Sequence, residues 1–282
     1  MRIFVAGATG AIGRRLLPLL IEAGHDVIGA TRTPDGAQHL RALGAHAHRL
    51  DALDAEAVTA ALAEHTPDVV MHQLTSLAAG NPADNARIRI EGTRNLVDAA
   101  KRAGVDRIIA QSISWAYEPG TTPAREQDPL DIHAGAPRAT TIGGIRALED
   151  AAAELPHHVV LRYGTLYGPG TWFAPGGLMA DKLTAGALPA NDGISSFVHV
   201  DDAARAALAA LDWANGPVNI VDDEPAPARA WAPVLADALR APAPEPTEGG
   251  APWERGADAT LARSRGWHPA HPTWRTGFHA QN

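Results

Sequence analysis

The sequence predicts an α/β protein built on a doubly wound parallel β-sheet. Two observations lead to this class. Short β-branched runs alternate with longer segments of helical spacing over the first 110 residues, and a glycine-rich turn joins the first run to the first helical segment. Strands and helices in alternation imply parallel strands joined by right-handed crossovers.

The expected elements follow one another in a regular order. The strand runs are largely apolar, as strands buried on both faces are, and they cover residues 3–6, 26–30, 45–50, 68–72, 107–112, 157–163 and 216–222. The expected helices cover residues 11–23, 35–43, 54–65, 86–104, 139–154, 200–212 and 228–240. Gly24 and Gly104 stand where a helix ends in a left-handed residue, and Asp54 stands where an N-cap is needed.

The turn after the first strand carries Gly7, Gly10 and Gly13 at a G-x-x-G-x-x-G spacing. Glycine lets the backbone approach a pyrophosphate, and the following helix N-terminus offers unpaired N–H groups and the positive end of its dipole. This context is typical of a Rossmann-type dinucleotide-binding turn. The other turn residues expected at the cofactor are Thr9, Ala11 and Ile12. The alternative is a tight turn without a ligand.

The residue that ends the second strand indicates which dinucleotide binds. Arg32 stands there, 19 residues beyond Gly13, and no acid follows before Asp35. An acid at this position binds the ribose 2′-OH of NAD, whereas an arginine accommodates the 2′-phosphate of NADP. We therefore expect NADP(H) in preference to NAD(H). The alternative is that Arg32 is a solvated surface charge.

Further cofactor contacts are expected where later strands end, because ligands of such sheets bind at the carboxyl ends of strands. Asp51 ends the third strand, with Ala52 after it, and could hold the adenine amino group or serve as a helix cap or loop carboxylate. The residues that end the fourth strand are Gln73, Leu74 and Thr75.

Two regions interrupt the alternation: residues 164–199 are rich in Gly and Pro, and residues 241–257 are rich in Pro. We therefore expect two domains. Residues 1–163 and 198–222 would form the dinucleotide-binding Rossmann domain. Residues 164–197 and 223–282 would form a small C-terminal substrate lobe.

Five segments follow one another in a familiar order: GATGAIG (7–13), RIEGTRNLVDAA (89–100), RIIAQSISWAY (107–117), LRYGTLYGPG (161–170) and FVHVDDAARAAL (197–208). Together they resemble the extended short-chain dehydrogenase/reductase superfamily, and more narrowly the NAD-dependent epimerase/dehydratase family. The resemblance runs from residue 1 to about 222 and implies a nicotinamide cofactor. It also implies that the turn after the sixth strand reaches the nicotinamide end, through Tyr163, Gly164 and Leu166, and it suggests a homodimer through residues 86–104 and 138–154.

The resemblance ends at the residues that carry the family's acid–base chemistry. Members place a Ser or Thr after the fifth strand and a Tyr-x-x-x-Lys pair on the next helix, where the Lys lowers the pKa of the Tyr. With Glu149 set against the family's Glu, Thr141 stands at the Tyr position and Ile145 at the Lys position. Neither side chain can replace the pair.

Other hydroxyls are therefore candidates for the catalytic role. Aligning Tyr117 with the motif that follows the fifth strand sets Ser112 on its first hydroxyl, which also makes Ser112 a cofactor contact. The catalytic candidates are thus Ser112, Tyr117 and Thr141. For Tyr117 the alternative is packing over the site.

Composition excludes several classes of function. A net charge of -8 disfavours nucleic acid and anionic membranes as partners, and the absence of cysteine removes thiolate chemistry and disulfides. The apolar run at the start of the sequence is too short for a secretory signal, and no run of 18 apolar residues occurs. We therefore expect a cytoplasmic protein. His46 and His48 alternate along a strand and His268 and His271 lie in the tail, but no zinc-binding motif accompanies them, so we expect no dedicated metal site.

These observations favour an atypical NADP(H)-dependent oxidoreductase that reduces a small-molecule carbonyl, enone or imine without the usual Tyr-x-x-x-Lys pair. An enone or iminium acceptor relaxes the need for that pair, because the cofactor performs the difficult step. One alternative is a non-catalytic NADP(H)-binding sensor or scaffold. A third is a sugar-nucleotide epimerase or dehydratase, which depends most on the missing pair.

Overall fold

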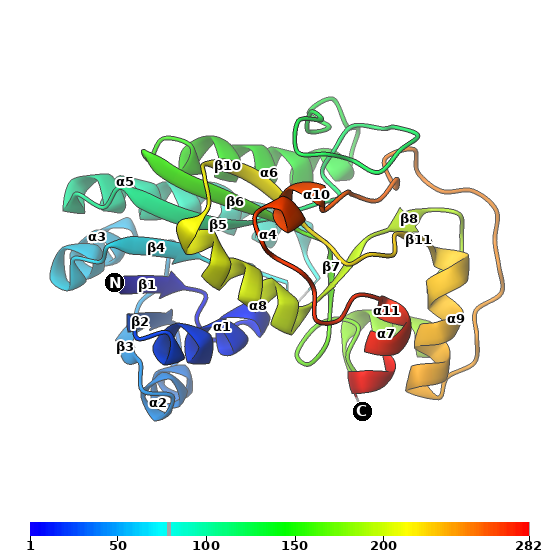
Figure 1. The fold of residues 1–282 in the computed structure, drawn as a ribbon, viewed down its shortest axis with the longest axis horizontal. Helices are drawn as coiled ribbons and strands as arrows, with labels where there is room; N and C mark the ends of the chain where they lie inside the picture. Colours follow the sequence, from blue (N-terminus) through cyan, green and yellow to red (C-terminus); the bar gives the residue numbers. More distant parts are fainter. Residues whose placement is uncertain (78–79, 282) are drawn as a thin grey trace. The chain divides into compact units, whose positions relative to one another are not determined.

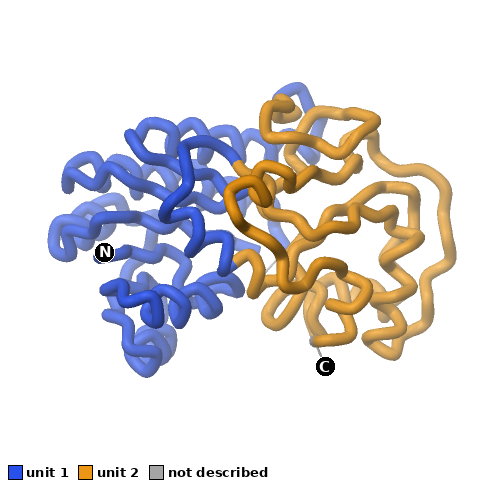
Figure 2. Tube along the Cα trace, viewed as in Figure 1, with its two compact units in different colours: residues 1–112, 132–161, 204–217 blue, residues 113–131, 162–203, 218–282 orange. Residues whose placement is uncertain are grey.

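The computed structural model describes residues 1–77 and 80–281. The chain divides into two compact units, coloured separately in Figure 2. Unit 1 comprises residues 1–112, 132–161 and 204–217, and unit 2 comprises residues 113–131, 162–203 and 218–282. Residues 113–131, 162–163, 198–203 and 218–222, which were expected in the Rossmann domain, lie in unit 2.

A seven-stranded sheet has the order β10-β6-β5-β4-β1-β2-β3 (Figure 1). Its strands are β1 (Arg2–Ala6), β2 (Asp26–Thr31), β3 (His46–Arg49), β4 (Val69–His72), β5 (Arg107–Ile113), β6 (His157–Tyr163) and β10 (Gly216–Ile220). The pairs β1–β2, β1–β4, β2–β3 and β4–β5 are parallel. Because the strand order reverses on either side of β1, the sheet is doubly wound, which confirms the predicted Rossmann-type α/β class.

The helices of unit 1 bury their apolar faces against this sheet. They are α1 (Ala11–Glu22), α2 (Pro34–Ala42), α3 (Ala55–His65), α4 (Pro82–Arg87), α5 (Thr93–Ala103) and α6 (Arg138–Ala152). One continuous core joins Val58 of α3, Leu96 of α5 and Leu148 of α6 to Phe4 and Ile108 of the strands. Each of these five side chains is at most 1% exposed, so burial of apolar surface holds this face together.

The expected helix ends are confirmed where capping residues stand. The side chain of Asp54 accepts hydrogen bonds from the backbone N–H groups of Glu56 and Ala57 and so caps α3. Gly24 has φ of 81° after α1, and Gly104 has φ of 71° after α5, as a left-handed helix terminus requires.

One predicted helix differs from its observed form. Residues 86–104 were expected as a single helix, but five residues between α4 and α5, η1 (Ile88–Gly92), form a π-helix. A π-helix inserts one residue into the turn, and the apolar periodicity of a sequence does not distinguish it from an α-helix. The helix expected at 200–212 is α8 (Val200–Ala209), continued by the short 3₁₀ turn η2 (Ala210–Asp212).

Unit 2 is built from short elements around an aromatic core. Its strands form two pairs, parallel β7 (Thr165–Tyr167) with β9 (Phe197–His199), and antiparallel β8 (Ile194–Ser195) with β11 (Ala226–Pro227). Its helices are α7 (Leu178–Thr184), α9 (Ala228–Leu239), α10 (Thr260–Ser264), α11 (Trp274–Gly277) and η3 (His279–Gln281). The core contains Tyr167, Phe197, Trp231, Trp274 and Phe278. Among the described residues, no helix of either unit has the length and apolar character that a membrane crossing needs.

Candidate functional site

The glycine turn between β1 and α1 has the backbone geometry that a pyrophosphate needs. Gly7 has φ of 90°, and its carbonyl accepts the backbone N–H of Gly10 at 3.0 Å. A Cβ on Gly13 would lie 2.3 Å from the Gly7 carbonyl oxygen, so no larger residue fits there. Gly10 is the N-cap of α1 and supplies no side chain to cap it, which leaves the first N–H groups of the helix for a ligand.

The remaining turn residues differ in the groups that they can present to a ligand. Thr9 uses its carbonyl to accept the Arg14 Nε–H at 2.9 Å, which fixes the turn from the side of the helix. Ile12 is 3% exposed and belongs to the core, so only its backbone can meet a ligand. Ala11 is half-buried at the first position of α1.

Arg32 follows β2 directly and is exposed. Its guanidinium makes no hydrogen bond or ion pair with any described residue. The next helix, α2, begins at Pro34 and is capped by Thr33, whose hydroxyl accepts the Gly36 N–H at 3.1 Å. The cap therefore ties down the backbone around Arg32 and leaves the guanidinium available to an anion.

Asp51 and Ala52 lie in the turn after β3. The Asp51 carboxylate accepts the backbone N–H of Leu53 at 3.0 Å, which is the loop role given above as the alternative to adenine binding. Ala52 is 7% exposed, and its carbonyl accepts the Asn95 Nδ2–H at 2.9 Å. Because Asp51 remains exposed, its second oxygen is accessible, and its contact with adenine stays a prediction.

The segment after β4 lies against the glycine turn. The N–H of Gln73 donates to the Ala6 carbonyl at 2.8 Å, and a Cβ on Gly7 would lie 2.4 Å from the Gln73 carbonyl oxygen. The Gln73 side chain is 4% exposed, yet among the described residues neither its amide oxygen nor its amide nitrogen has a hydrogen-bond partner. Leu74 and Thr75 after it are half-buried. A buried amide without partners indicates a polar group that a ligand would supply, so a dinucleotide fits this turn.

His72, which ends β4, was not singled out from the sequence. It is fully buried; its Nδ1 accepts the Leu74 N–H at 3.2 Å, and its Nε2 lies 2.7 Å from the Thr93 hydroxyl. Burial, reinforced by the charge of Arg89, lowers the pKa of His72 to about 4. Arg89 is itself 4% exposed, and burial lowers its pKa to about 10. A neutral His72 thus holds the backbone that follows Gln73 in place.

Ser112 and Thr141 are the catalytic candidates of unit 1. Ser112 lies on β5 and is completely buried, and its hydroxyl donates to the Glu149 carboxylate at 2.6 Å. Thr141 lies on the first half of α6 and is half-buried. Ile145, one turn further along α6, is completely buried. The helix therefore presents no side chain that can transfer a proton near neutral pH where a Tyr and a Lys would stand.

Tyr117, the catalytic candidate of unit 2, is 1% exposed. Its hydroxyl donates to the Asn219 side-chain oxygen at 2.5 Å, and the Arg162 guanidinium lies over its ring at 4.8 Å. The Asn219 amide nitrogen in turn donates to the carbonyls of Ala124 and Asp258, each at 3.1 Å. This enclosed network favours packing over catalysis for Tyr117, whose role as an acid stays a prediction.

The turn after β6 is held by backbone contacts within unit 2. Tyr163 is 1% exposed, and its hydroxyl donates to the Ala203 carbonyl at 3.2 Å, as a structural residue would. Gly164 donates its N–H to the Ile220 carbonyl at 2.9 Å, and a Cβ there would lie 2.7 Å from the Ser196 carbonyl oxygen. Leu166 is half-buried on β7. The expected cofactor contacts at this turn stay a prediction.

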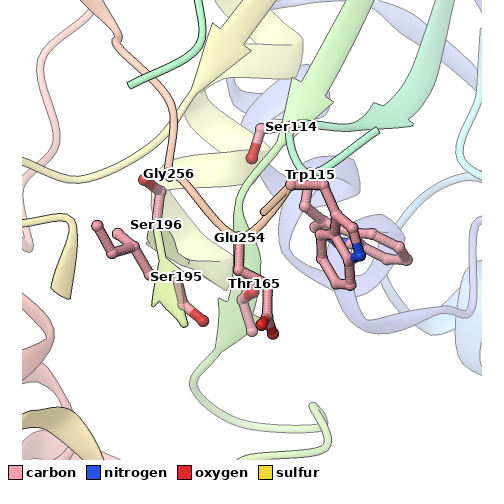
Figure 3. A pocket seen from close by; sticks show the side chains of 9 residues that line it. Ser114, Trp115, Thr165, Ser195, Ser196, Glu254 and Gly256 are labelled. Atoms are coloured by element: carbon pink, nitrogen blue, oxygen red, sulfur yellow. The ribbon is translucent and has the colours of Figure 1, made fainter. Parts of the chain in front are cut away.

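Unit 2 contains a pocket that the sequence did not reveal (Figure 3). Its volume is about 200 Å³. The lining residues are Ser114, Trp115, Thr165, Ile194, Ser195, Ser196, Trp253, Glu254 and Gly256. They come from four segments far apart in the chain, so only the folded structure brings them together. The one signal in the sequence is the presence of a tryptophan, Trp115, beside the hydroxyl motif after the fifth strand.

Two clusters of imidazole and carboxylate groups also come together. In unit 1, His48 Nδ1 lies 2.9 Å from His65 Nε2, with Glu64 beside them. In unit 2, the rings of His199 and His271 stack with centroids 3.8 Å apart, close to Asp201. The His271 Nδ1 also lies 3.0 Å from the carboxylate of Asp202, which accepts the N–H groups of Ala270 and His271. Asp202 lies in the first turn of α8 and anchors the C-terminal segment.

The fold and the glycine turn define a dinucleotide-binding α/β protein of the Rossmann type. Residues 3–221 match the NAD-dependent epimerase/dehydratase family, and the chain belongs to this family. This confirms the resemblance inferred from the five sequence segments and supports the prediction of an NAD(P)-dependent oxidoreductase that uses a nicotinamide dinucleotide.

Known proteins similar to this chain include a reductase and several epimerases. A Streptomyces protein named 3-diazoavenalumate denitrifying reductase is 42% identical, over 99% of each chain. The UDP-glucose 4-epimerase of Thermotoga maritima, solved with UDP-glucose, has a TM-score of 0.78 at 24% identity and covers 100% of this chain and 97% of its own. The UDP-glucose 4-epimerase of Thermus thermophilus, solved with NAD, has a TM-score of 0.77 at 22% identity, with the same coverage. At these identities the two structures establish the fold.

Proposed function

We propose that this protein is an NADP(H)-dependent reductase of a small electrophile that needs no proton from the protein. One observation carries the proposal: α6 has Thr141 and Ile145 at the positions of the family's acid–base pair, while the glycine turn is intact. An enzyme that lacks this pair but keeps its cofactor turn is best suited to substrates whose reduction is complete without general acid catalysis.

The residues that would hold the cofactor lie in unit 1. The backbone of Gly7, Gly10 and Gly13 would receive the pyrophosphate at the start of α1. The exposed guanidinium of Arg32 would pair with a 2′-phosphate, which is the basis for preferring NADP(H). The buried amide of Gln73 would find in the cofactor the polar partner that it otherwise lacks among the described residues.

The substrate class that we propose is an aromatic diazo compound in its cationic diazonium form. It is supported by the name of the relative at 42% identity, a denitrifying reductase of a diazo compound. An aryl diazonium carbon carries its own leaving group, N₂. When bound, a reduced nicotinamide supplies a hydride, and the transfer of that hydride to a diazonium carbon gives the arene, N₂ and the oxidised cofactor with no proton added.

The chain's own hydroxyls would then bind and orient rather than protonate. The Ser112 hydroxyl already donates its proton to Glu149 at 2.6 Å, and the Tyr117 hydroxyl donates to Asn219 at 2.5 Å. Each of these protons is committed to a buried acceptor. The two hydroxyls therefore hold neighbouring buried side chains in position. The reaction proposed here needs no proton from either of them.

The test is a turnover assay with a panel of acceptors. The purified protein is mixed with NADPH and an aryl diazonium salt, an enone, an imine, a ketone or a UDP-sugar, and both cofactor oxidation and product are measured. A reaction without protein gives the chemical background, which matters because diazonium salts are reactive. We expect turnover with the diazonium salt above background. No turnover with any acceptor would overturn the proposal.

The same panel separates the other two functions considered for this chain. Tight NADPH binding without turnover would favour a sensor or scaffold. Epimerisation of the UDP-sugar would favour the activity named for the similar structures, although the missing Tyr and Lys argue against it. The homodimer through the helices at 86–104 and 138–154 also remains a proposal, which light scattering of the purified protein would test.

A further inference from the structure

The pocket of unit 2 has an aromatic wall. Trp115 is 38% exposed, which is unusual for so large an apolar side chain, and Trp253 is half-buried. The centroids of their rings lie 6.2 Å apart with an angle of 40° between the planes, so the two indoles pack together. A cavity of about 150 Å³ is enough to hold a benzene ring. The pocket, at about 200 Å³, therefore has room for one.

The same pocket contains a single charged residue among the described residues that line it, Glu254. Its carboxylate is held in place, because Oε2 accepts the backbone N–H of Ala251 at 2.6 Å and a Cβ on Gly193 would lie 2.4 Å from that oxygen. Figure 3 shows Glu254 and Thr165 among the side chains that line the pocket. None of the described residues that line the pocket is a lysine, an arginine or a histidine.

The other polar groups are hydroxyls, and they differ in their availability. Ser196 is 5% exposed, and its hydroxyl is occupied by the backbone of Ala257, with the N–H of Ala257 donating to it at 2.9 Å. Ser195 and Thr165 are half-buried at the pocket wall. A serine or threonine hydroxyl can donate or accept, so these groups do not select the charge of a ligand. Selection by charge falls to Glu254.

We propose that this pocket binds a planar aromatic cation, with its ring against the indoles of Trp115 and Trp253 and its positive charge toward Glu254. The faces of indole rings attract cations, and a carboxylate adds an opposite charge. An anionic ring of equal size would meet the Glu254 carboxylate, and no described lining residue would supply a counter-charge. The inference rests on the proposed function in one respect: it identifies the substrate of that reductase as an aromatic electrophile that binds as a cation.

The experiment measures binding without turnover, so that it does not depend on the reaction. Benzamidinium, benzamide and benzoate are planar rings of nearly the same size that carry a positive charge, no charge and a negative charge. Their dissociation constants are measured by isothermal titration calorimetry on the full chain, in the absence of cofactor. We expect benzamidinium to bind about tenfold more tightly than benzamide, and benzoate more weakly than either.

Two variants and a control assign this preference to the pocket. Glu254→Gln keeps a side-chain oxygen that can accept the Ala251 N–H and should remove the preference for benzamidinium over benzamide. Trp253→Leu should weaken both ligands about tenfold. Trp213→Leu is the matched control, because Trp213 is likewise half-buried but lies in unit 1, and it should change neither constant.

The outcomes distinguish the two proposals. Equal or tighter binding of benzoate, or a cation preference that survives Glu254→Gln, would overturn the pocket assignment. If Trp253→Leu does not fold, the Glu254→Gln comparison still decides. A preserved cation preference with no turnover in the acceptor panel would leave the pocket assignment standing and overturn the reductase.

Discussion

Arg32 is the residue on which the choice of cofactor depends. Its guanidinium is exposed at the end of β2, and a charge-assisted pair with a 2′-phosphate contributes about 1.5–3 kcal/mol. We therefore expect Arg32→Ala to raise the Kd for NADPH by about tenfold or more and to leave the Kd for NADH nearly unchanged. Fluorescence titration with both cofactors measures this, with Arg41→Ala on the exposed face of α2 as the control. Equal losses of affinity for NADPH and NADH would show that Arg32 does not bind the 2′-phosphate.

A second single residue, Tyr167, bears on stability rather than on cofactor binding. It is completely buried among the aromatic side chains of unit 2, its hydroxyl has no hydrogen-bond partner among the described residues, and burial raises the pKa of this hydroxyl well above its usual value. Removing an unpaired buried hydroxyl costs nothing in hydrogen bonding. Tyr167→Phe should therefore leave the free energy of unfolding unchanged or raise it by about 1 kcal/mol.

Tyr117→Phe is the matched comparison. It deletes the hydrogen bond to Asn219 and leaves a buried amide oxygen short of a partner, so the free energy of unfolding should fall by about 1–3 kcal/mol. Urea denaturation of both variants measures the difference. If Tyr167→Phe were as destabilising as Tyr117→Phe, the Tyr167 hydroxyl would have a partner after all. An unchanged kcat in Tyr117→Phe would also exclude this residue as an acid.

At the scale of elements, replacing a glycine by alanine should change the free energy of unfolding in opposite directions in two helices. A Cβ on Gly13 of α1 would lie 2.3 Å from the Gly7 carbonyl oxygen, so Gly13→Ala must displace the turn and should cost about 1–3 kcal/mol as well as cofactor affinity. Gly143 of α6 is exposed, and a Cβ there would meet no atom of a described residue within 4 Å. Gly143→Ala should therefore raise the free energy of unfolding by about 0.5–1 kcal/mol.

Thermal unfolding with and without NADPH measures both variants. The expected result is a lower Tm for Gly13→Ala with little shift on adding NADPH, and a higher Tm for Gly143→Ala with the normal shift. A normal NADPH shift in Gly13→Ala would mean that the turn between β1 and α1 is not the cofactor site.

Elements that are determined by residues close together in the sequence could be predicted. The glycine spacing at 7–13, the cap at Asp54 and the turn at Gly104 depend on neighbouring residues alone, and the structure confirms the cap and the turn. The register of α6 through Glu149 came instead from the resemblance to the family and stays a prediction; in the structure the Ser112 hydroxyl donates to the Glu149 carboxylate. The two- and three-residue strands β7, β8, β9 and β11 could not, because they exist only through pairing with distant segments.

The pocket of unit 2 was unpredictable for a related reason. Trp115 and Trp253 lie far apart in the sequence, and the segment that carries Trp253 and Glu254 was distinguished only by its Pro-rich composition. The backbone N–H of Ile194 binds the Glu254 carbonyl at 2.9 Å and fixes that segment beside the pocket. Such a contact leaves no periodic pattern in the sequence. The buried partners of His72 likewise depend on the packing of β4 against its neighbours.

For the whole molecule, one buried acid should govern stability above neutral pH. Asp222 is 2% exposed, and burial raises its pKa to about 8. Its unfolded-state pKa is near the ordinary value, about 4. The folded state therefore holds a proton that the unfolded state releases, and the free energy of unfolding falls as pH rises toward and through 8. Between pH 7 and 9 the fall should be about 1.4 kcal/mol.

Urea denaturation at pH 7 and 9 tests this dependence. Burial lowers the pKa of His72 to about 4, so its effect on stability ends near pH 6.5 and does not enter this window. The variant Asp222→Asn cannot titrate and should lose most of the change. A wild-type stability that is flat or rising between pH 7 and 9 would contradict the assignment to Asp222.

The central claim is that this protein reduces its substrate with a hydride from the cofactor and no proton from a side chain. The most direct measurement uses NADPH carrying two deuterium atoms at nicotinamide C4, an aryl diazonium substrate and ordinary water, with mass spectrometry of the product. The account predicts one deuterium per arene, at the carbon that carried N₂, and N₂ released in equal amount. An arene without deuterium, or no product above the background without protein, would contradict it.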